Sequence, residues 1–186
     1  STRRWLILVC ITAFGLELAA HAGVFVVDFL QEDRGFSATA SNFMLVLAGL
    51  PGIPAMIAAG NLSDRYGRRI VGCSFAVASG IGAMGFFWLP FGTPVLYACM
   101  TLMLAGQLGA GPVLSTYASE LFPTAVRGQA SSWSKVAQVS GQAASFGLGG
   151  LLITVTGGLP GATTALMIGP VIAVVLFATM FPDTHG

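Results

Sequence analysis

Six long apolar stretches dominate this chain of 186 residues, and each is close to the roughly 20 residues that a helix needs to cross a bilayer. Charged residues make up only 8% of the sequence and hydrophobic residues 55%, whereas a soluble domain carries about 25% charged residues. So few charges cannot cover a surface that faces water. We therefore predict an all-α integral membrane protein. Its six transmembrane helices are expected at about residues 5–30, 40–60, 70–89, 94–117, 132–155 and 162–181.

The basic residues alternate along the chain. Seven of the eight lie in three polar gaps, namely residues 3–4, 60–69 and 120–135, and only Arg34 lies outside them. Cytoplasmic loops of membrane proteins retain Lys and Arg, so every second gap is expected on the cytoplasmic side. An even number of spans then puts both termini there. We predict a multi-pass protein of the plasma membrane, which in a Gram-negative bacterium is the inner membrane.

The start of the chain also has features of a secretory signal. Arg3 and Arg4 precede an apolar run, and Ala20-His21-Ala22 fits an A-x-A cleavage site. However, Glu17 interrupts the apolar run, and the five later spans need a correctly oriented first helix. We therefore predict that this stretch is a transmembrane helix.

The second polar gap contains a motif of two glycines, one acid and three arginines: Gly60, Asp64, Arg65, Gly67, Arg68 and Arg69. The glycines permit a tight turn between two helices that nearly touch. Asp64 is suited to accept hydrogen bonds at the N-terminus of a neighbouring helix, and the arginines to pair with acids on adjacent helix ends. A plain basic loop would explain the arginines but not the acid and the glycines.

This motif resembles the signature loop of the major facilitator superfamily, G-x-x-x-D-R-x-G-R-R/K. Residues 109–128, which include Glu120 and Arg127, are similar to the tenth helix and following loop of its sugar-porter and metabolite:proton symporter branches. Residues 181–186 are similar to the P-E-T-K-G of sugar porters, although Asp183 and His185 replace Glu and Lys. Residues 94–117 lack the arginine that is typical of an N-terminal half, which supports placement as a C-terminal half. Val139 stands near a position where sugar porters often have an arginine, so the substrates of sugar porters cannot be assigned to this chain.

The resemblance implies that the chain is the C-terminal six-helix half of a transporter, built from two three-helix inverted repeats. The N-terminal half is absent from this chain. It would be supplied by the same full-length protein, or a second copy of this chain would take its place. The resemblance also implies a cytoplasmic gate in which Glu120 pairs with Arg68 or Arg69, while Asp64 approaches a helix N-terminus of the missing half.

The first span carries ionisable residues at membrane depth. Helical steps of about 100° place Glu17, His21 and Asp28 on one stripe. Such groups are costly in the bilayer and normally face a cavity or a partner. Burial disfavours a charged carboxylate, so Glu17 is our first candidate for exchanging a coupling proton, with His21 as its partner. Alternatively, Glu17 and His21 make structural hydrogen bonds to other helices.

Three amides and one lysine add to the predicted substrate cavity, together with Asp28: Gln107, Lys135, Gln138 and Gln142. In the fifth span Lys135, Gln138 and Gln142 share a face, and Lys135 alternatively extends to the cytoplasmic interface. The residues Gly141, Ser145 and Gly149 form a separate face of small side chains suited to close helix packing. The third and sixth spans, which the family directs toward lipid, lack such polar residues. Pro51 and Pro54 predict a bent second span.

We therefore expect a secondary transporter half that moves a small polar metabolite by alternating access, coupled to protons. The alternative is a membrane module that does not transport and acts as an interaction partner or sensor. The sequence shows no nucleophile–base pair, phosphate loop or metal-ligand spacing, so we predict neither an enzyme, nor a cofactor or metal, nor a nucleic-acid partner. The expected partners are the lipid bilayer, a small-molecule substrate and a six-helix half.

Overall fold

The computed structural model describes residues 2–19, 21–90 and 92–180, and over these ranges the chain is helical with short turns. Ten helical segments occur in the order α1 (Thr2–Glu17), α2 (His21–Val24), α3 (Val26–Glu32), α4 (Ala38–Gly49), α5 (Gly52–Tyr66), α6 (Arg68–Trp88), α7 (Thr93–Leu121), α8 (Thr124–Thr156), α9 (Leu159–Leu166) and α10 (Ile168–Met180). They form six units long and apolar enough to cross a membrane: α1–α3, α4–α5, α6, α7, α8 and α9–α10. The predicted fold class is confirmed. The sugar-porter-like residues 181–186 lie outside the described residues.

The helices extend well beyond the predicted spans. The polar gap between the fourth and fifth spans is helical except at Phe122 and Pro123, and the gap between the second and third spans contains Gly67 as its one non-helical residue. Gly67 has a φ of +88°, which a residue with a side chain rarely adopts, so it allows α5 and α6 to meet in a sharp turn. Hydropathy marks the part of a helix inside the bilayer core, and polar helix ends continue into water.

The first span is not the continuous helix that the sequence predicts. It breaks after Glu17 and again at Phe25. At the first break Leu18 N bonds Gly15 O (3.3 Å) in the tighter i→i+3 pattern. Steps of about 100° therefore cannot be carried from Glu17 to Asp28, so they do not place Asp28 on one stripe with Glu17.

Two other spans are also interrupted. The second breaks at Leu50 and Pro51, as the prolines predict. The sixth breaks at Met167, between α9 and α10, where the sequence predicts one helix. The cause is Pro170, which has no N–H to donate to the carbonyl of Leu166 four residues earlier. This span also begins at Leu159, three residues earlier than predicted.

The first helix of each three-span repeat packs against the second and third spans of the other repeat. α1 contacts α8 and α10, and α7 contacts α5 and α6. The backbones approach closely where α1 crosses α10, because a side chain on Gly15 would lie 2.9 Å from the carbonyl oxygen of Gly169. Small residues at such crossings allow membrane helices to gain van der Waals contact.

Two hydrophobic cores hold the two halves of the first span. Phe29 and Leu30 of α3 pack with Phe86 of α6 and its neighbours, whereas Val9 of α1 packs in a second core with Phe177 of α10. The first break, which begins at Leu18, separates the part held by one core from the part held by the other.

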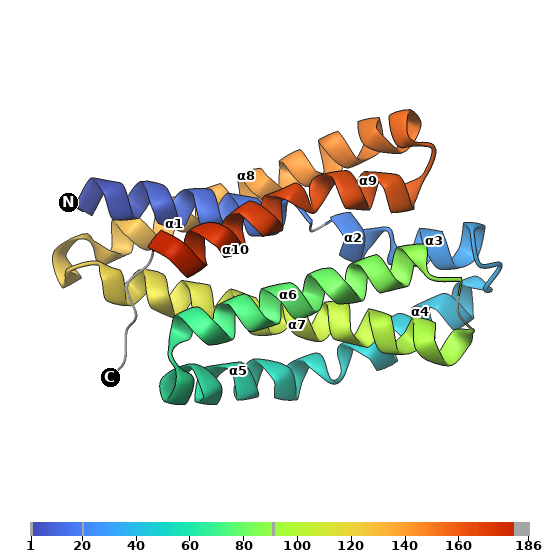
Figure 1. Cartoon of the computed structure of the whole chain (residues 1–186), viewed down its shortest axis with the longest axis horizontal. Helices are drawn as coiled ribbons and strands as arrows, with labels where there is room; N and C mark the ends of the chain where they lie inside the picture. Colours follow the sequence, from blue (N-terminus) through green and yellow to red (C-terminus); the bar gives the residue numbers. More distant parts are fainter. Residues whose placement is uncertain (1, 20, 91, 181–186) are drawn as a thin grey trace.

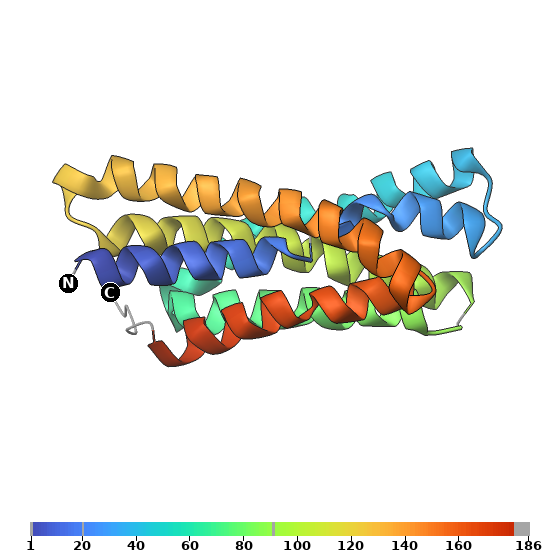
Figure 2. The same cartoon turned by 90° about the horizontal axis from the view of Figure 1, so that it is seen from above.

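The basic residues gather at one end of the bundle. The start of α1, the α5–α6 turn, the α7–α8 turn and the end of α10 all lie at the left of Figure 1 and Figure 2. The α3–α4, α6–α7 and α8–α9 connections lie at the opposite end, and Arg34 is there. Its guanidinium donates to Leu89 O (2.6 Å) and stacks over the Phe29 ring at 5.3 Å from the centroid.

Candidate functional site

A cavity of about 340 Å³ opens beside the break in the first span. Its polar wall contains the proton-coupling candidate Glu17 and three of the predicted substrate-cavity residues, Gln107, Gln138 and Gln142, from three different spans. The folded chain therefore brings together side chains that are up to 125 positions apart in the sequence. A space of this size fits the range of about 300–1,000 Å³ typical of small-molecule sites.

Glu17 is positioned by the end of α1 and by close packing on α8. It is the last residue of α1 and is half-buried. A side chain on Gly141 would lie 2.5 Å from the carbonyl oxygen of Phe14 and 3.1 Å from the Cβ of Glu17. One turn along α8, the buried Ser145 donates its hydroxyl to Leu18 O (2.7 Å). The predicted small-residue face of α8 is thus the contact that holds the broken end of α1.

Lys135 lies at the edge of this site. Its ammonium donates to Gln138 Oε1 at 3.1 Å, and it interacts electrostatically with the carboxylate of Glu17. The side chain is exposed. Since Gln138 lines the cavity, the hydrogen bond turns Lys135 toward the polar wall.

Asp28 does not join this group, contrary to the sequence prediction. It lies exposed on α3, beyond both breaks in the first span, and the cavity wall is formed without it. The side chain of His21 is outside the described part of the structure, so its place near Glu17 remains a prediction.

The third and sixth spans contribute to the cavity, although the sequence directs them toward lipid. Ser79 and Gly80 of α6, with Met167 and Pro170 of the sixth span, line it. Glycine at the crossing of α6 and α7 makes this possible: a side chain on Gly106 would lie 2.5 Å from the backbone nitrogen of Ser79. Sequence reasoning missed Ser79 because a single serine in an apolar helix is a weak signal. Its position next to Gly80 was the available hint.

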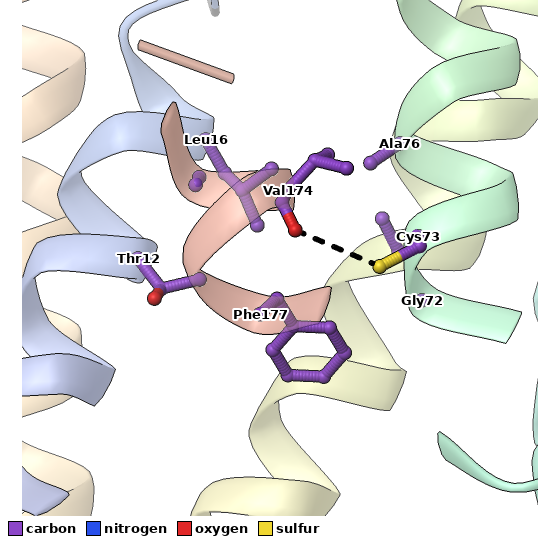
Figure 3. Close-up of a pocket in the computed structure, with 9 residues that line it drawn as sticks. Thr12, Leu16, Gly72, Cys73, Ala76, Val174 and Phe177 are labelled. Carbon is purple, nitrogen blue, oxygen red and sulfur yellow. Dashed lines mark hydrogen bonds between the residues drawn. The ribbon is translucent and has the colours of Figure 1, made fainter. Parts of the chain in front are cut away.

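A much smaller cavity, of about 20 Å³, lies next to the first one, between α1, α6, α7 and α10 (Figure 3). The two cavities share wall residues, including Leu16 and Ala76. Its lining is almost wholly apolar, and the thiol of Cys73 donates to Val174 O across it at 3.8 Å. This space holds about one water molecule and is too small for a metabolite.

At the basic end of the bundle, the guanidinium of Arg68 joins three helices. It lies 2.6 Å from Glu120 Oε1 at the end of α7 and 3.3 Å from Asp64 Oδ1 on α5. Arg68 is mostly buried, at 16% side-chain exposure, whereas Asp64 is 68% exposed. The predicted pairing of Glu120 with the arginine cluster is therefore present. The exposed carboxylate of Asp64 has a free side for a further donor.

The rest of the predicted gate lies around this pair. Arg65 and Arg127 are exposed, Arg69 is half-buried, and Gly60 lies one turn before Asp64 on α5. Together with the turn at Gly67, these residues form the basic end of the bundle.

We compared the sequence with known protein families and the fold with solved structures. The sequence matches the Major Facilitator Superfamily over residues 6–186. The chain belongs to the major facilitator superfamily. This membership in a transporter superfamily bears out the prediction that the chain is not an enzyme. No curated protein matches the chain by sequence.

Solved structures share the superfamily fold. The inward-open conformation of the xylose transporter XylE from E. coli superposes with a TM-score of 0.81 at 19% identity, covering 99% of this chain and 49% of that chain. A crystal structure of the D-xylose-proton symporter gives a TM-score of 0.75 at 22% identity, with 96% and 48% covered. The chain thus spans about half the length of the solved structures that it matches.

Proposed function

We propose that this chain is the C-terminal half of a secondary active transporter that moves a small polar metabolite by alternating access, coupled to protons. The observation that carries the proposal is the cavity at the break in the first span, which joins one carboxyl and three amides in an otherwise apolar bundle. Amides suit the hydrogen-bonding groups of a polar substrate. The superfamily assignment supports the transport mechanism.

The remaining half is proposed to cover the second and fifth spans. Among the six spans these two have the smallest buried share, 17% each. Large apolar side chains are exposed along them, such as Val46, Ile57 and Val139. An N-terminal half from the same full-length protein, or a second copy of this chain, would bury these faces and enclose the cavity. Matching half the length of XylE supports this arrangement.

Glu17 is proposed as the proton-coupling residue, with His21 as its partner. Glu17 is the carboxyl in the cavity wall and stands where the first span changes direction. A carboxyl at that point can change protonation state as the span moves and substrate binds. The cytoplasmic cluster around Arg68 and Glu120 is proposed to favour the state closed to the cytoplasm, with both termini on that side of the plasma membrane.

The test is uptake into proteoliposomes by the product of the intact gene. Sugars, organic acids and drugs are supplied with and without a pH gradient. Accumulation of one class that follows the gradient supports the proposal. A correctly folded, reconstituted protein that moves none of these compounds would contradict it and favour a module that does not transport.

A further inference from the structure

We propose that the substrate is a small anion, with Lys135 as its counter-ion, and that it enters together with one proton carried by Glu17. This inference rests on the proposed transport function and goes beyond it by naming the charge class of the substrate. Three features support it: the position of Lys135, the presence of a single ionisable residue in the described cavity lining, and the charge balance of the cavity with substrate bound.

The first feature is the hydrogen bond that places Lys135 at the cavity. Lys135 is six residues before Gly141, about 9 Å along α8, and Gly141 is the residue that packs against Glu17. A lysine that served only to reach the headgroups would extend away from the cavity. Instead its ammonium binds Gln138 Oε1 at 3.1 Å, and Gln138 is part of the cavity wall.

The second feature is that Glu17 is the one ionisable residue among the described residues that line the cavity. α10 contains no ionisable residue. α6 and α7 line the cavity with serine, alanine, glycine, leucine and the amide of Gln107. The charged residues of α7 and of the start of α6 are at the cytoplasmic end, where Glu120 binds Arg68. Cys10 and Cys73 also lie toward that end, and His21 follows Glu17 beyond the break.

The third feature is the charge balance. In the empty site a Glu17 carboxylate compensates the Lys135 ammonium. An arriving carboxylate or similar monoanion takes the lysine as its partner, and Glu17 then binds a proton from the outer solution. The loaded site therefore has the same net charge of zero as the empty one, and it avoids carrying an unpaired charge through the bilayer. In the cytoplasm the anion and the proton both leave, and Glu17 pairs with Lys135 again.

This exchange makes substrate and proton depend on each other. The Lys135 ammonium favours the charged form of the Glu17 carboxyl, so an anion that takes Lys135 as its partner makes protonation of Glu17 easier. Without the proton, the anion and Glu17 leave two negative charges against one positive charge. A neutral sugar gives no reason for Lys135 at the cavity, and its entry with a proton would move one net positive charge.

The experiment uses the full-length transporter in proteoliposomes with labelled gluconate and labelled glucose, two probes that differ chiefly in a carboxylate. Valinomycin and potassium set the membrane potential independently of the pH gradient. We expect uptake of gluconate that follows the pH gradient and does not change with the potential. Lys135→Gln should raise the gluconate KM by about tenfold or more, the contribution of a hydrogen bond to a charged group. Lys135→Arg should keep most of the affinity, and Arg4→Gln, which removes an exposed charge elsewhere, should change nothing.

The outcomes separate this inference from the proposed function. Uptake of glucose but not gluconate, with a KM that Lys135→Gln does not alter, would overturn the anion proposal and leave the transporter proposal standing. Gluconate uptake that accelerates with an inside-negative potential would overturn the charge balance. Failure of both probes, and of every compound in the wider panel, would overturn the transport function and this inference with it.

Discussion

At the scale of single residues, the structure separates the polar groups into those that share a site and those that do not. Glu17, Gln107, Gln138 and Gln142 line one cavity, whereas Asp28 is exposed at the other side of two helix breaks. Their order in the sequence does not show this. Lys135 is linked to the cavity by its bond to Gln138.

Replacing Glu17 by Gln tests the coupling role. The amide keeps the shape of the side chain but cannot exchange a proton. We expect accumulation driven by a pH gradient to be lost, while counterflow exchange of substrate continues within a few-fold of the normal rate. Both are measured in the same proteoliposomes. Normal gradient-driven accumulation by Glu17→Gln would make this residue structural.

Reversing charges at Arg68 and Glu120 tests the cytoplasmic gate. Arg68→Glu places a third acid beside Asp64 and Glu120 and should strongly reduce uptake. Adding Glu120→Arg restores one opposite-charge contact and should recover part of it, with a coupling of about 0.5–3 kcal/mol in a double-mutant cycle. Uptake rates of the two single variants and the double variant supply the cycle. Additive losses would argue that the 2.6 Å contact has no part in gating.

At the scale of elements, helix crossings decide the shape of the site. α8 approaches α1 so closely at Gly141 that a methyl group would contact the backbone of Phe14. The break in the first span, the hydroxyl of Ser145 and the position of Glu17 all depend on this crossing. The segments before and after the break at Leu18 also belong to separate cores.

Gly141→Ala tests the crossing, and Gly147→Ala on the same helix is its control. A Cβ at Gly141 would lie 2.5 Å from Phe14 O, whereas a Cβ at Gly147 meets nothing within 4 Å. We expect Gly141→Ala to destabilise by about 1–3 kcal/mol through overpacking. Gly147→Ala should be neutral or stabilise by up to about 1 kcal/mol through helix propensity. Thermal unfolding in detergent measures both, and equal melting temperatures for the two variants would contradict the close crossing.

At the scale of the whole molecule, the bundle has a basic end, an opposite end with Arg34, and two spans whose outer faces the chain leaves open. Each three-span repeat packs its first helix against the second and third spans of the other repeat, and this holds the six spans together as one unit. It also leaves the second and fifth spans with the smallest buried share, 17% each, which is the surface that we propose the other half covers.

Topology in the membrane is testable by labelling. In a cysteine-free background, single cysteines at Asp33 and Gly158 should react with an impermeant thiol reagent added outside intact cells. A cysteine at Ser63 should react only after permeabilisation, because the basic end is predicted to be cytoplasmic. Labelling at Ser63 from outside would reverse the orientation.

Much of this protein is determined by the sequence alone. Hydropathy is a local property: each residue has its own cost of entering the bilayer, so the six spans, the positions of most turns and the end that collects arginines can be read directly. The family resemblance of the motif from Gly60 to Arg69, together with the acid at Glu120, predicted the pairing that the structure shows. Glu17 and the three glutamines were identified because polar groups in apolar helices are costly.

What only the tertiary structure decides is how these residues meet. A break in a helix, such as the one at Leu18, persists because another helix holds its free backbone groups, as Ser145 does for Leu18. The extension of the cavity to Ser79 depends on glycines at a crossing between two distant segments. Such contacts depend on pairs of helices, whereas hydropathy and helix propensity describe one residue at a time, so the sequence identifies the components of the site but not their arrangement.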